Sequence, residues 1–394
     1  MLHRSATAVL MDKAQHYPIV AIIGPRQSGK STLARYLFPE KPYCSLEDLD
    51  HRQFATLDPR GFLGQFSKGA VLDEVQHCPE LFSYLQTLVD FQSQQGLFVL
   101  TGSQQFGLVA KITQSLAGRV GFVQLLPFTL GELQAANMSP ANLENMLFTG
   151  FYPPIYDRKI TSQSWHSDYV MTYIERDVRQ LLNVVDLRTF HRFLQMCAMR
   201  TGQLLNLSSL ANDCGITHNT AKAWISVLEA SYILFLLSPH YRNYNKRLIK
   251  TPKLYFYDTG LACLLAGIQN AEQLIAHPIR GAVFETWVVT ELLKNRFNQG
   301  LLSNLYFWRD SQGHEVDVLI EEGDVLIPIE IKSGQTINQD YFTGLQYWQT
   351  LSLQSTCAWL IYAGEQNQKR TDARIIGWKN ITEILGSLPN LSLK

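Results

Sequence analysis

The stretch that most constrains the fold of this chain is Gly-x-x-x-x-Gly-Lys-Ser, which begins at Gly24 and directly follows the apolar run 19–23. A helical pattern comes next, so the order is strand, glycine loop, helix. In that order the backbone N–H groups of the loop converge on phosphate oxygens, and the helix dipole adds to the attraction. Lys30 then reaches the β- and γ-phosphates, and the Ser31 hydroxyl binds Mg²⁺. We therefore predict a nucleotide-binding loop, called the P-loop below, that comprises Gly24, Pro25, Arg26, Gln27, Ser28, Gly29, Lys30, Ser31 and Thr32.

Two later strands end in polar residues that suit the same site. The apolar stretch "GAVLDEVQ" ends its strand in Asp73 and Glu74. An aspartate at this place binds the metal through water, and the glutamate beside it polarises the attacking water. The next apolar run, "LFVLTG", precedes Ser103, which either senses the γ-phosphate or closes a plain turn at the end of the strand. Arg119 either acts as a finger on a neighbour's nucleotide or pairs with a surface acid.

A second group of charged residues lies in apolar sequence near the other end of the chain. The stretch "EVDVLIEEGDVLIPIEIKSG" predicts one strand that ends near Ile320, the turn "EEGD", and a second strand over 325–331. Because side chains alternate along a strand, Glu330 and Lys332 share a face, and Asp317 on the partner strand can meet them. Two convergent carboxylates repel each other. A divalent metal relieves that repulsion, while the lysine orients or deprotonates a water.

The spacing Asp-x₁₂-Glu-x-Lys resembles that of PD-(D/E)XK nucleases, which have the restriction-endonuclease-like fold. Upstream, the amphipathic stretch "RGAVFETWVVTELLK" offers Glu285, which corresponds to the additional helical acid of that fold. The resemblance implies a nuclease site made of Glu285, Asp317, Glu330 and Lys332, with Asp317 and Glu330 as metal ligands. Two alternatives stay open. A solvent-facing hairpin can carry such charges by chance, and a related domain can keep the fold for binding or packing without cleavage.

The middle of the chain carries an excess of positive charge, since residues 151–270 hold 13 Lys and Arg against 8 Asp and Glu, a net charge of +5. Within it, residues 204–237 predict a helix, a tight turn at Gly215, and a second helix capped by Thr217. Polar side chains face outward near the start of this second helix, where a recognition helix would meet DNA. They are His218, Asn219, Thr220 and Lys222.

A strand hairpin is predicted after these helices, and together they would form a winged helix. Its tip carries Arg242, Lys246 and Arg247, which would contact the DNA backbone. Winged helices on ATPases also serve as nucleotide lids or docking surfaces. Basic residues at a hairpin tip are also common simply because they are exposed to solvent. DNA contact is therefore one of several possible roles for this domain. The stretch 165–200 predicts helices whose apolar positions form a bundle core.

The motifs "GPRQSGKSTL", "VLDEVQ", "LTGSQQ", "SLAGR" and "LLPFTLGEL" resemble those of bacterial and archaeal AAA-type ATPases that carry a C-terminal domain of unknown function. The similarity continues through "TGFYPPIY", "YIERDVRQL", "LYFYDTGL", "RGAVFETWVVTELLK" and "LYFWRDSQGHEVDVLI", so it covers nearly the whole chain. It implies ATP as the nucleotide, bound by residues 24–32, with Asp73 and Glu74 as the acidic pair. Ser31 stands where many of these relatives have threonine, and either hydroxyl can bind Mg²⁺.

A chain of 394 residues is long enough for about two or three domains. We expect an α/β protein with an AAA-type P-loop NTPase core and parallel sheet over 1–150, a helical and winged-helix domain over 151–275, and a restriction-endonuclease-like α/β domain over 276–394. The sequence has no apolar run near the roughly 18 residues that span a bilayer, no signal peptide, and no metal-type cysteine spacing. We therefore expect a cytoplasmic protein with reduced, buried thiols and no membrane partner.

These features predict an ATP-hydrolysing enzyme that acts on nucleic acid, with ATP and Mg²⁺ as cofactors and DNA as a partner of the middle and C-terminal domains. ATP would gate metal-dependent phosphodiester cleavage through contacts between domains, because the γ-phosphate would order the elements that bear Ser103 and Arg119. One alternative is an ATP-driven switch whose C-terminal domain binds DNA or protein without cutting. Another is an assembly ATPase that forms a homo-oligomeric ring, in which Arg119 reaches across to a neighbour.

Overall fold

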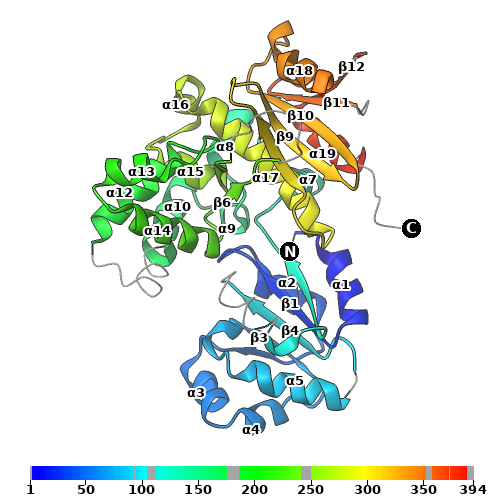
Figure 1. Cartoon of the computed structure of the whole chain (residues 1–394). Coiled ribbons are helices and arrows are strands. Elements are labelled where there is room, and N and C mark those ends of the chain that lie inside the picture. Colours follow the sequence, from blue (N-terminus) through cyan, green and yellow to red (C-terminus); the bar gives the residue numbers. More distant parts are fainter. Residues whose placement is uncertain are drawn as a thin grey trace.

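The computed structural model describes residues 2–92, 94–103, 112, 114–174, 186–240, 250–351, 357–371 and 373–387. Figure 1 shows three regions: a blue and cyan N-terminal sheet with its helices, a group of green helices, and a yellow-to-red sheet. The yellow helix α17 (Arg280–Asn298) runs from the last sheet toward the first and packs against both.

The N-terminal region is a parallel sheet covered by helices. Its described strands are ordered β2-β3-β4-β1-β5. They are β1 (Ile19–Ile23), β2 (Tyr43–Ser45), β3 (Ala70–Asp73), β4 (Phe98–Gly102) and β5 (Val120–Gln124). The helices are α1 (Thr7–His16), α2 (Lys30–Leu37), α3 (Leu49–Leu57), α4 (Pro59–Gly64) and α5 (Leu81–Gln92), with a 3₁₀ turn at Val75–His77. Strands β1, β3 and β4 are buried throughout, as parallel strands covered on both faces should be.

The middle region is mainly helical. It contains α7 (Leu130–Ala135), α8 (Leu143–Thr149), α9 (Pro153–Asp157), α10 (Ser162–Tyr169), a π-helical turn (Val170–Ile174), α12 (Leu187–Ala198), α13 (Leu207–Cys214), α14 (His218–Ala230), β6 (Leu234–Leu237), β7 (Lys253–Phe256), α15 (Thr259–Leu265) and α16 (Ala271–Ala276). Gly215 (φ 70°) joins α13 to α14, and Thr217 caps α14 by accepting a hydrogen bond from Thr220 N at 3.1 Å, both as predicted. Strands β6 and β7 pair antiparallel. The helical stretch predicted over 165–200 is interrupted by the π-helical turn, and residues 175–185 within it lie outside the described residues.

The C-terminal region is a mixed sheet in which the described strands are ordered β12-β13-β11-β10-β9-β8. The strands are β8 (Leu305–Arg309), β9 (Glu315–Glu322), β10 (Val325–Lys332), β11 (Ala358–Tyr362), β12 (Gln368–Lys369) and β13 (Ala373–Gly377). Its helices are α17, α18 (Thr343–Leu351) and α19 (Ile381–Ser387), with 3₁₀ turns at Gln339–Phe342 and Trp378–Asn380. The predicted hairpin is present with a tighter turn. Strand β9 continues to Glu322, and Gly323 adopts the left-handed conformation (φ 60°) that a two-residue connection requires.

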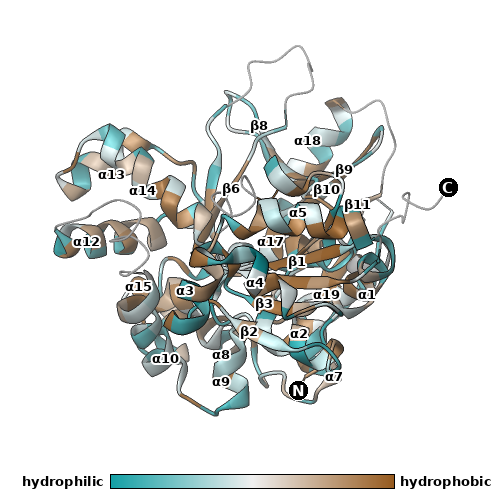
Figure 2. Cartoon of the chain, turned by 90° about the horizontal axis from the view of Figure 1, so that it is seen from below, coloured by the Kyte–Doolittle hydropathy of each residue, from teal (hydrophilic) through white to brown (hydrophobic). Residues whose placement is uncertain are grey.

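The middle and C-terminal regions share one hydrophobic core. A single cluster of buried side chains extends from Leu126 to Ile384, whereas two separate clusters cover the faces of the N-terminal sheet. Helix α17 is buried on several sides and contributes Phe284 and Trp287 to the shared cluster. Figure 2 shows brown, hydrophobic segments at the centre around β1 and α17, with teal helices such as α10 at the periphery. A helix that is apolar around much of its circumference belongs inside the protein, which places α17 between the regions.

The cysteines agree with the expectation of buried thiols at every position but one. All six cysteines are free thiols, and five of them are buried. Cys357 is exposed, so the prediction of a buried thiol is wrong there. It directly precedes β11, and Ala358 is the first residue of that strand to enter the core. Within the described residues, no helix is both long and apolar enough to cross a membrane.

Candidate nucleotide site and C-terminal acidic cluster

The P-loop joins β1 to α2 at the edge of the sheet where the parallel strands end. Gly24 (φ 153°), Gln27 (φ 61°) and Gly29 (φ 92°) all have positive φ values. A Cβ atom on Gly24 would lie 2.2 Å from Leu125 O, so only glycine fits beside the chain there. Gly29 is the N-cap of α2, whose first N–H groups have no partner within the helix. The loop therefore offers converging backbone donors to an anion.

Lys30 lies across the P-loop and is almost fully buried. Its Nζ donates to Gly24 O at 3.1 Å and to Pro25 O at 2.7 Å. Burial lowers the pKa of Lys30 below its ordinary value, although the charges of Glu74 and Asp73 act in the opposite direction. A cation fixed in advance at this position can stabilise the charge of a phosphate chain without further reorganisation.

Asp73 ends β3 and receives three side-chain hydrogen bonds. Ser31 Oγ donates to Asp73 Oδ1 at 2.6 Å, and Tyr43 Oη donates to Oδ2 at 2.6 Å. Thr101, at the end of the neighbouring strand β4, also donates to Oδ1. The structure thus brings Ser31 and Asp73 together, as predicted for a Mg²⁺ site. A hydroxyl and a carboxylate in contact are the oxygen donors that Mg²⁺ prefers, so these residues fit the ion.

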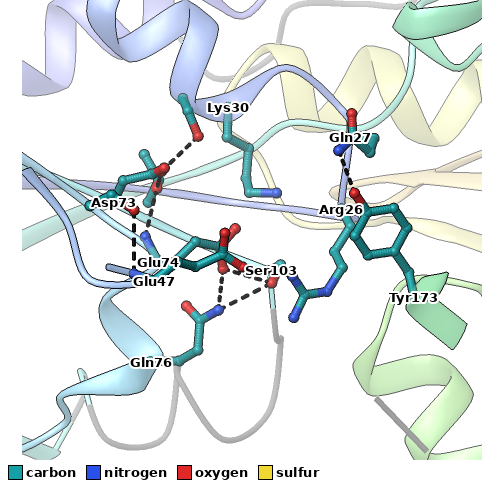
Figure 3. A network of polar contacts seen from close by, with 12 residues as sticks. Arg26, Gln27, Lys30, Glu47, Asp73, Glu74, Gln76, Ser103 and Tyr173 are labelled. Atoms are coloured by element: carbon teal, nitrogen blue, oxygen red, sulfur yellow. Dashed lines mark hydrogen bonds and ion pairs between the residues drawn. The ribbon is translucent and has the colours of Figure 1, made fainter. Parts of the chain in front are cut away.

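Glu74 follows Asp73 in the left-handed conformation (φ 55°), which turns its side chain toward the end of β4. Ser103 Oγ donates to Glu74 Oε2 at 2.9 Å, and Gln76 Nε2 contacts both residues. Figure 3 shows this group beside Lys30 and Arg26. Burial alone would raise the pKa of Glu74, but Lys30 and the hydrogen bond from Gln76 outweigh it, so the pKa lies below its ordinary value. Glu74 is therefore ionised at neutral pH.

A cavity of about 260 Å³ connects these residues to the middle region. On one side it is lined by the P-loop, Asp73 and Glu74, and on the other by Leu2, Arg4, Phe128, Pro153, Pro154, Asp157, Arg158 and Tyr173. Gln27 Nε2 donates to Tyr173 Oη at 2.8 Å, and the Arg26 guanidinium lies 5.6 Å from the centre of the same ring. The sequence reasoning missed this second wall, because its residues come from the start of the chain and from the segment 128–173, outside the nucleotide-binding motifs.

Arg119 lies at the opposite edge of the sheet from the P-loop. Strand β5 runs parallel to β1 and begins at Val120 beside Ile19, so Arg119 is separated from the loop by the length of β1, roughly 16 Å. Its Nε and Nη2 donate to Asp90 at 2.6 and 2.8 Å. The expectation that a γ-phosphate orders Arg119 within the same chain is therefore wrong. The predicted pairing with a surface acid is present, and a role on a neighbour's nucleotide stays a prediction.

The predicted C-terminal residues meet in a second cavity, of about 550 Å³. Asp317 from β9, Glu330 and Lys332 from β10, and Glu285 from α17 all line it. Asp317 Oδ2 accepts a hydrogen bond from Ile331 N at 2.8 Å and lies 3.9 Å from Lys332 Nζ, which also donates to Glu330. The alternation of side chains along the hairpin thus places these groups as predicted.

Four carboxylates and three cations line this cavity, and together they are called the C-terminal cluster below. The carboxylates belong to Glu285, Glu315, Asp317 and Glu330, and the cations to Lys253, Lys332 and Arg309. Burial and the nearby Asp317 charge raise the pKa of Glu330 to about 8. Burial also raises the pKa of Glu285. For both acids the effect of burial outweighs that of the neighbouring lysine, so the charged form is disfavoured.

A metal ion fits the C-terminal cluster only in part. Glu330 Oε2 is buried without a hydrogen-bond partner among the described residues, so it is available as a metal ligand. Against this, the described residues contain no group of three or more His, Cys, Asp and Glu side chains arranged to hold a metal. Asp317 and Glu330 would therefore supply two ligands, with further oxygens from water or substrate.

Sequence reasoning missed two members of this site, Lys253 and Tyr255, which come from β7 of the middle region. Lys253 Nζ pairs with Glu285 Oε1 at 3.0 Å and with Glu315, and Tyr255 Oη donates to Glu285 Oε1 at 2.6 Å. A signal was present in "TPKLYFYD", where a lysine opens an apolar strand just as Lys332 closes one. Nothing in the sequence said which strands would meet.

The predicted nucleic-acid surface of the middle region is described only at its helix. His218, Asn219 and Lys222 are exposed at the start of α14, and Thr220 is half-buried. Arg242, Lys246 and Arg247, predicted at the hairpin tip, lie outside the described residues. The geometry of a helix pair followed by two antiparallel strands is present.

Comparison with family models matches each region separately. Residues 16–134 match a model described as an AAA domain. Residues 140–272 match "Domain of unknown function (DUF8612)", and residues 280–381 match "Domain of unknown function (DUF4143)". The P-loop, the acidic pair and the parallel sheet agree with the first match. The N-terminal region is therefore an AAA-type P-loop ATPase domain.

Over 339 residues the chain is 32% identical to the uncharacterized proteins Rv2008c of Mycobacterium tuberculosis and Mb2031c of Mycobacterium bovis. The match covers 84% of this chain and 74% of each relative, so the chain belongs to their family. Among solved structures, the Walker-type ATPase PABY2304 of Pyrococcus abyssi is similar over 67% of this chain and 96% of its own, at 16% identity and a TM-score of 0.46. AMPPCP-bound DnaA from Aquifex aeolicus is similar over 57% and 85%, at 16% identity and a TM-score of 0.28.

Proposed function

We propose that the chain binds and hydrolyses ATP at the P-loop and uses the state of the nucleotide to control nucleic-acid cleavage at the C-terminal cluster. One observation carries this proposal: the single helix α17 contacts the segment that closes the nucleotide cavity and also bears Glu285 of the cluster.

At the P-loop, Lys30 balances the charge of the β- and γ-phosphates. Ser31 and Asp73 would hold Mg²⁺, which would supply further positive charge beside the phosphates. Glu74 orients the attacking water and accepts its proton, since its lowered pKa keeps it ionised. Ser103, which contacts Glu74 at 2.9 Å, can report whether the γ-phosphate is present.

The test of this step is ATP turnover by the purified chain. Glu74→Gln keeps the hydrogen-bonding shape but not the base, so we expect ATP to bind while turnover falls by a factor of about 10² to 10⁴. Lys30→Ala should lose both ATP binding and ATP turnover. The exposed Glu80 is the matched control, and Glu80→Gln should hydrolyse ATP at the wild-type rate. Unchanged turnover in Glu74→Gln would contradict the assignment.

The connection between the sites runs through Arg4 and α17. Arg4 Nη1 donates to Ser28 O of the P-loop at 2.8 Å, and Arg4 Nη2 donates to Leu126 O at 2.5 Å. Helix α17 forms two hydrogen bonds with the segment 128–130, which lies just after Leu126. Leu130 N donates to Glu291 Oε2 at 2.9 Å, and Lys294 Nζ donates to Phe128 O at 2.7 Å.

Glu291 and Glu285 are six positions apart on α17, which is about 9 Å along a helix. A shift of the P-loop that moves Arg4 would therefore move the backbone at 126–130, and a rigid helix would transmit the movement to the C-terminal cluster. Tyr173, bonded to Gln27, provides a second contact between the P-loop and the middle region. These contacts support control by ATP in a direct, mechanical sense.

At the C-terminal cluster we propose phosphodiester cleavage. A divalent metal held by Asp317 and Glu330 would polarise the scissile phosphate. Lys332 contacts both acids, and their charges outweigh burial and raise the pKa of its ammonium. It would therefore orient the attacking water as a cation, and Glu285 would complete the acidic lining. The exposed side chains at the start of α14 and the basic residues Arg242, Lys246 and Arg247 would bind the nucleic-acid backbone as a winged helix does.

Incubation with supercoiled plasmid tests this part of the proposal. We expect nicking that needs Mg²⁺ or Mn²⁺, is lost in Asp317→Ala, and weakens in Lys30→Ala. Asp340→Ala, in the 3₁₀ turn before α18, is an exposed acidic control that should cut normally. An intact plasmid in every condition, with ATP hydrolysis preserved, would contradict cleavage.

A second candidate is an ATP-driven switch whose C-terminal region binds nucleic acid or protein without cutting. The specific observation in its favour is Lys253, whose ammonium already neutralises Glu285 and Glu315. Nucleic-acid binding with a steep salt dependence, with no nicking, would favour this candidate.

A further inference from the structure

One cation of the C-terminal cluster comes from a different region of the chain. Lys253 opens β7 in the middle region, and its side chain is only 4% exposed. We propose that the Lys253 ammonium competes with a divalent metal for the carboxylates of the C-terminal cluster. The wild-type chain would therefore bind a metal there more weakly than the same carboxylates would without Lys253. The inference rests on the proposed metal-dependent role of the cluster.

The backbone around Lys253 is held from the middle region, so its ammonium is delivered by a fixed segment. Leu254 N donates to Gln203 O at 2.9 Å, and Leu205 N donates to Pro252 O at 2.8 Å. Strand β6 pairs with β7 on the other side. The side chain passes 5.5 Å from the centre of the Phe307 ring before it reaches the acids. Lys253 is thus a fixed, buried part of the cluster and not a flexible surface lysine.

The position of Lys253 ties up an acid that a metal would need. Glu285 Oε1 accepts hydrogen bonds from both Lys253 Nζ and Tyr255 Oη, at 3.0 and 2.6 Å. Glu315 pairs with the same ammonium and with Arg309 at 3.1 Å. The described residues contain no group of three or more His, Cys, Asp and Glu side chains arranged to hold a metal.

Glu330 gives a second and independent indication that the cluster can accept a further cation. It is 6% exposed and lines the same cavity, and its Oε2 has no hydrogen-bond partner among the described residues. Its other oxygen accepts from Lys332. A buried carboxylate oxygen without a donor is costly, and a bound cation would remove that cost.

The charge balance shows why removal of Lys253 should favour a divalent ion. With all groups ionised, the three cations and four carboxylates of the cavity sum to a charge of −1. Loss of Lys253 would leave −2, which one divalent cation neutralises. Like charges repel more strongly in a partly buried cavity than in water, so an ammonium among the ligands opposes the entry of a metal.

The test is Mn²⁺ titration of the full chain without nucleotide, with unbound Mn²⁺ measured by electron paramagnetic resonance. We expect Lys253→Gln to bind Mn²⁺ at least about tenfold more tightly than the wild type, while Lys253→Arg, which keeps the charge, stays near the wild-type value. The additional binding should disappear when Asp317→Asn is added, which separates the cluster from the P-loop site. Arg309→Gln removes a more exposed cation from the same cavity and should change the affinity less, by about threefold at most.

Lys253→Met is the second neutral variant, because methionine keeps the length of the side chain beside Phe307. Circular dichroism and thermal unfolding report that each variant is folded. Unchanged or weaker Mn²⁺ binding in both folded neutral variants would overturn the inference.

The inference and the proposed cleavage can fail separately. Tighter Mn²⁺ binding in Lys253→Gln, without plasmid nicking in any variant, would contradict the proposed cleavage and support the competition between Lys253 and the metal. Nicking by the wild type, with Mn²⁺ affinity unaltered in Lys253→Gln and Lys253→Met, would support the cleavage and contradict the competition.

Discussion

The P-loop site and the C-terminal cluster each bury a glutamate beside a lysine, yet the two acids respond in opposite ways. At the P-loop, burial would raise the pKa of Glu74, but Lys30 and the hydrogen bonds from Gln76 and Ser103 lower it overall. In the cluster, burial and the Asp317 charge raise the pKa of Glu330 to about 8 in spite of Lys332. The comparison teaches that nearby cations and hydrogen-bond donors outweigh burial at Glu74, whereas burial and a neighbouring carboxylate outweigh the lysine at Glu330.

The largest effect is expected from removal of Arg4, the buried cation that connects the P-loop to its surroundings. Arg4 is buried, and it bonds Ser28 O, Leu126 O and Glu132. Arg4→Met would leave Glu132 buried without its ion pair, so we expect the free energy of unfolding to fall by about 3 to 5 kcal/mol. Chemical denaturation measures this. Arg35→Met, on the exposed face of α2, is the control and should change it by less than about 0.5 kcal/mol. Equal losses in both variants would show that Arg4 does not link the P-loop to its surroundings.

The second prediction concerns the backbone of the P-loop. A Cβ atom on Gly24 would lie 2.2 Å from Leu125 O, so Gly24→Ala must shift the loop away from β5. We expect nucleotide binding to weaken by about 1 to 3 kcal/mol, measured with a fluorescent ATP analogue. Gly64→Ala is the matched control, since nothing lies within 4 Å of its Cβ position. Similar affinities in the two variants would mean that the loop is not the phosphate site.

The third prediction uses the raised pKa of Glu330. Because the folded chain binds this proton more tightly than the unfolded chain, the stabilisation is complete below about pH 4.5 and is lost as the pH rises through about 8. Glu330→Gln cannot titrate, so its stability should decline less between pH 6 and pH 9, by about 2 to 3 kcal/mol. Urea unfolding at several pH values measures this. Glu272→Gln, at an exposed position of α16, should decline as the wild type does, and an identical decline in Glu330→Gln would place the proton elsewhere.

The smallest effect is expected at Arg119. Its pair with Asp90 is exposed and lies at the edge of the sheet away from the P-loop, so Arg119→Ala should leave both the unfolding transition and the ATP turnover per chain unchanged. Turnover measured over a range of protein concentrations sharpens the comparison. A loss that appears only as the concentration rises would show that the P-loop site is completed by a neighbouring chain.

The predictable parts of both sites are those whose geometry is local. The P-loop works through the backbone of consecutive residues, so its spacing in the sequence already contains its shape. Asp317, Glu330 and Lys332 lie on one hairpin, and strand alternation alone brings them together. The position of Arg119 could also have been predicted, because it precedes a parallel strand whereas Asp73 ends one.

The remaining site residues depend on packing between regions, which no local pattern records. Lys253 reaches the cluster only because β7 packs beside α17, and Tyr173 reaches Gln27 only because the middle region covers the P-loop. Gln76 contacts Glu74 because Glu74 takes a left-handed conformation that glutamate rarely adopts. Sequence reasoning could identify the charged groups of each site but not the partners that set their pKa values.

The most direct test of the account is hydrogen–deuterium exchange of Glu74→Gln with and without ATP, since this variant should hold ATP without hydrolysing it. If the nucleotide state reaches the C-terminal cluster, ATP should slow amide exchange in the P-loop and also alter it in α17 and in β10. Saturating ATP that protects the P-loop but leaves α17 and β10 unchanged would contradict the coupling, and the two sites would then act independently.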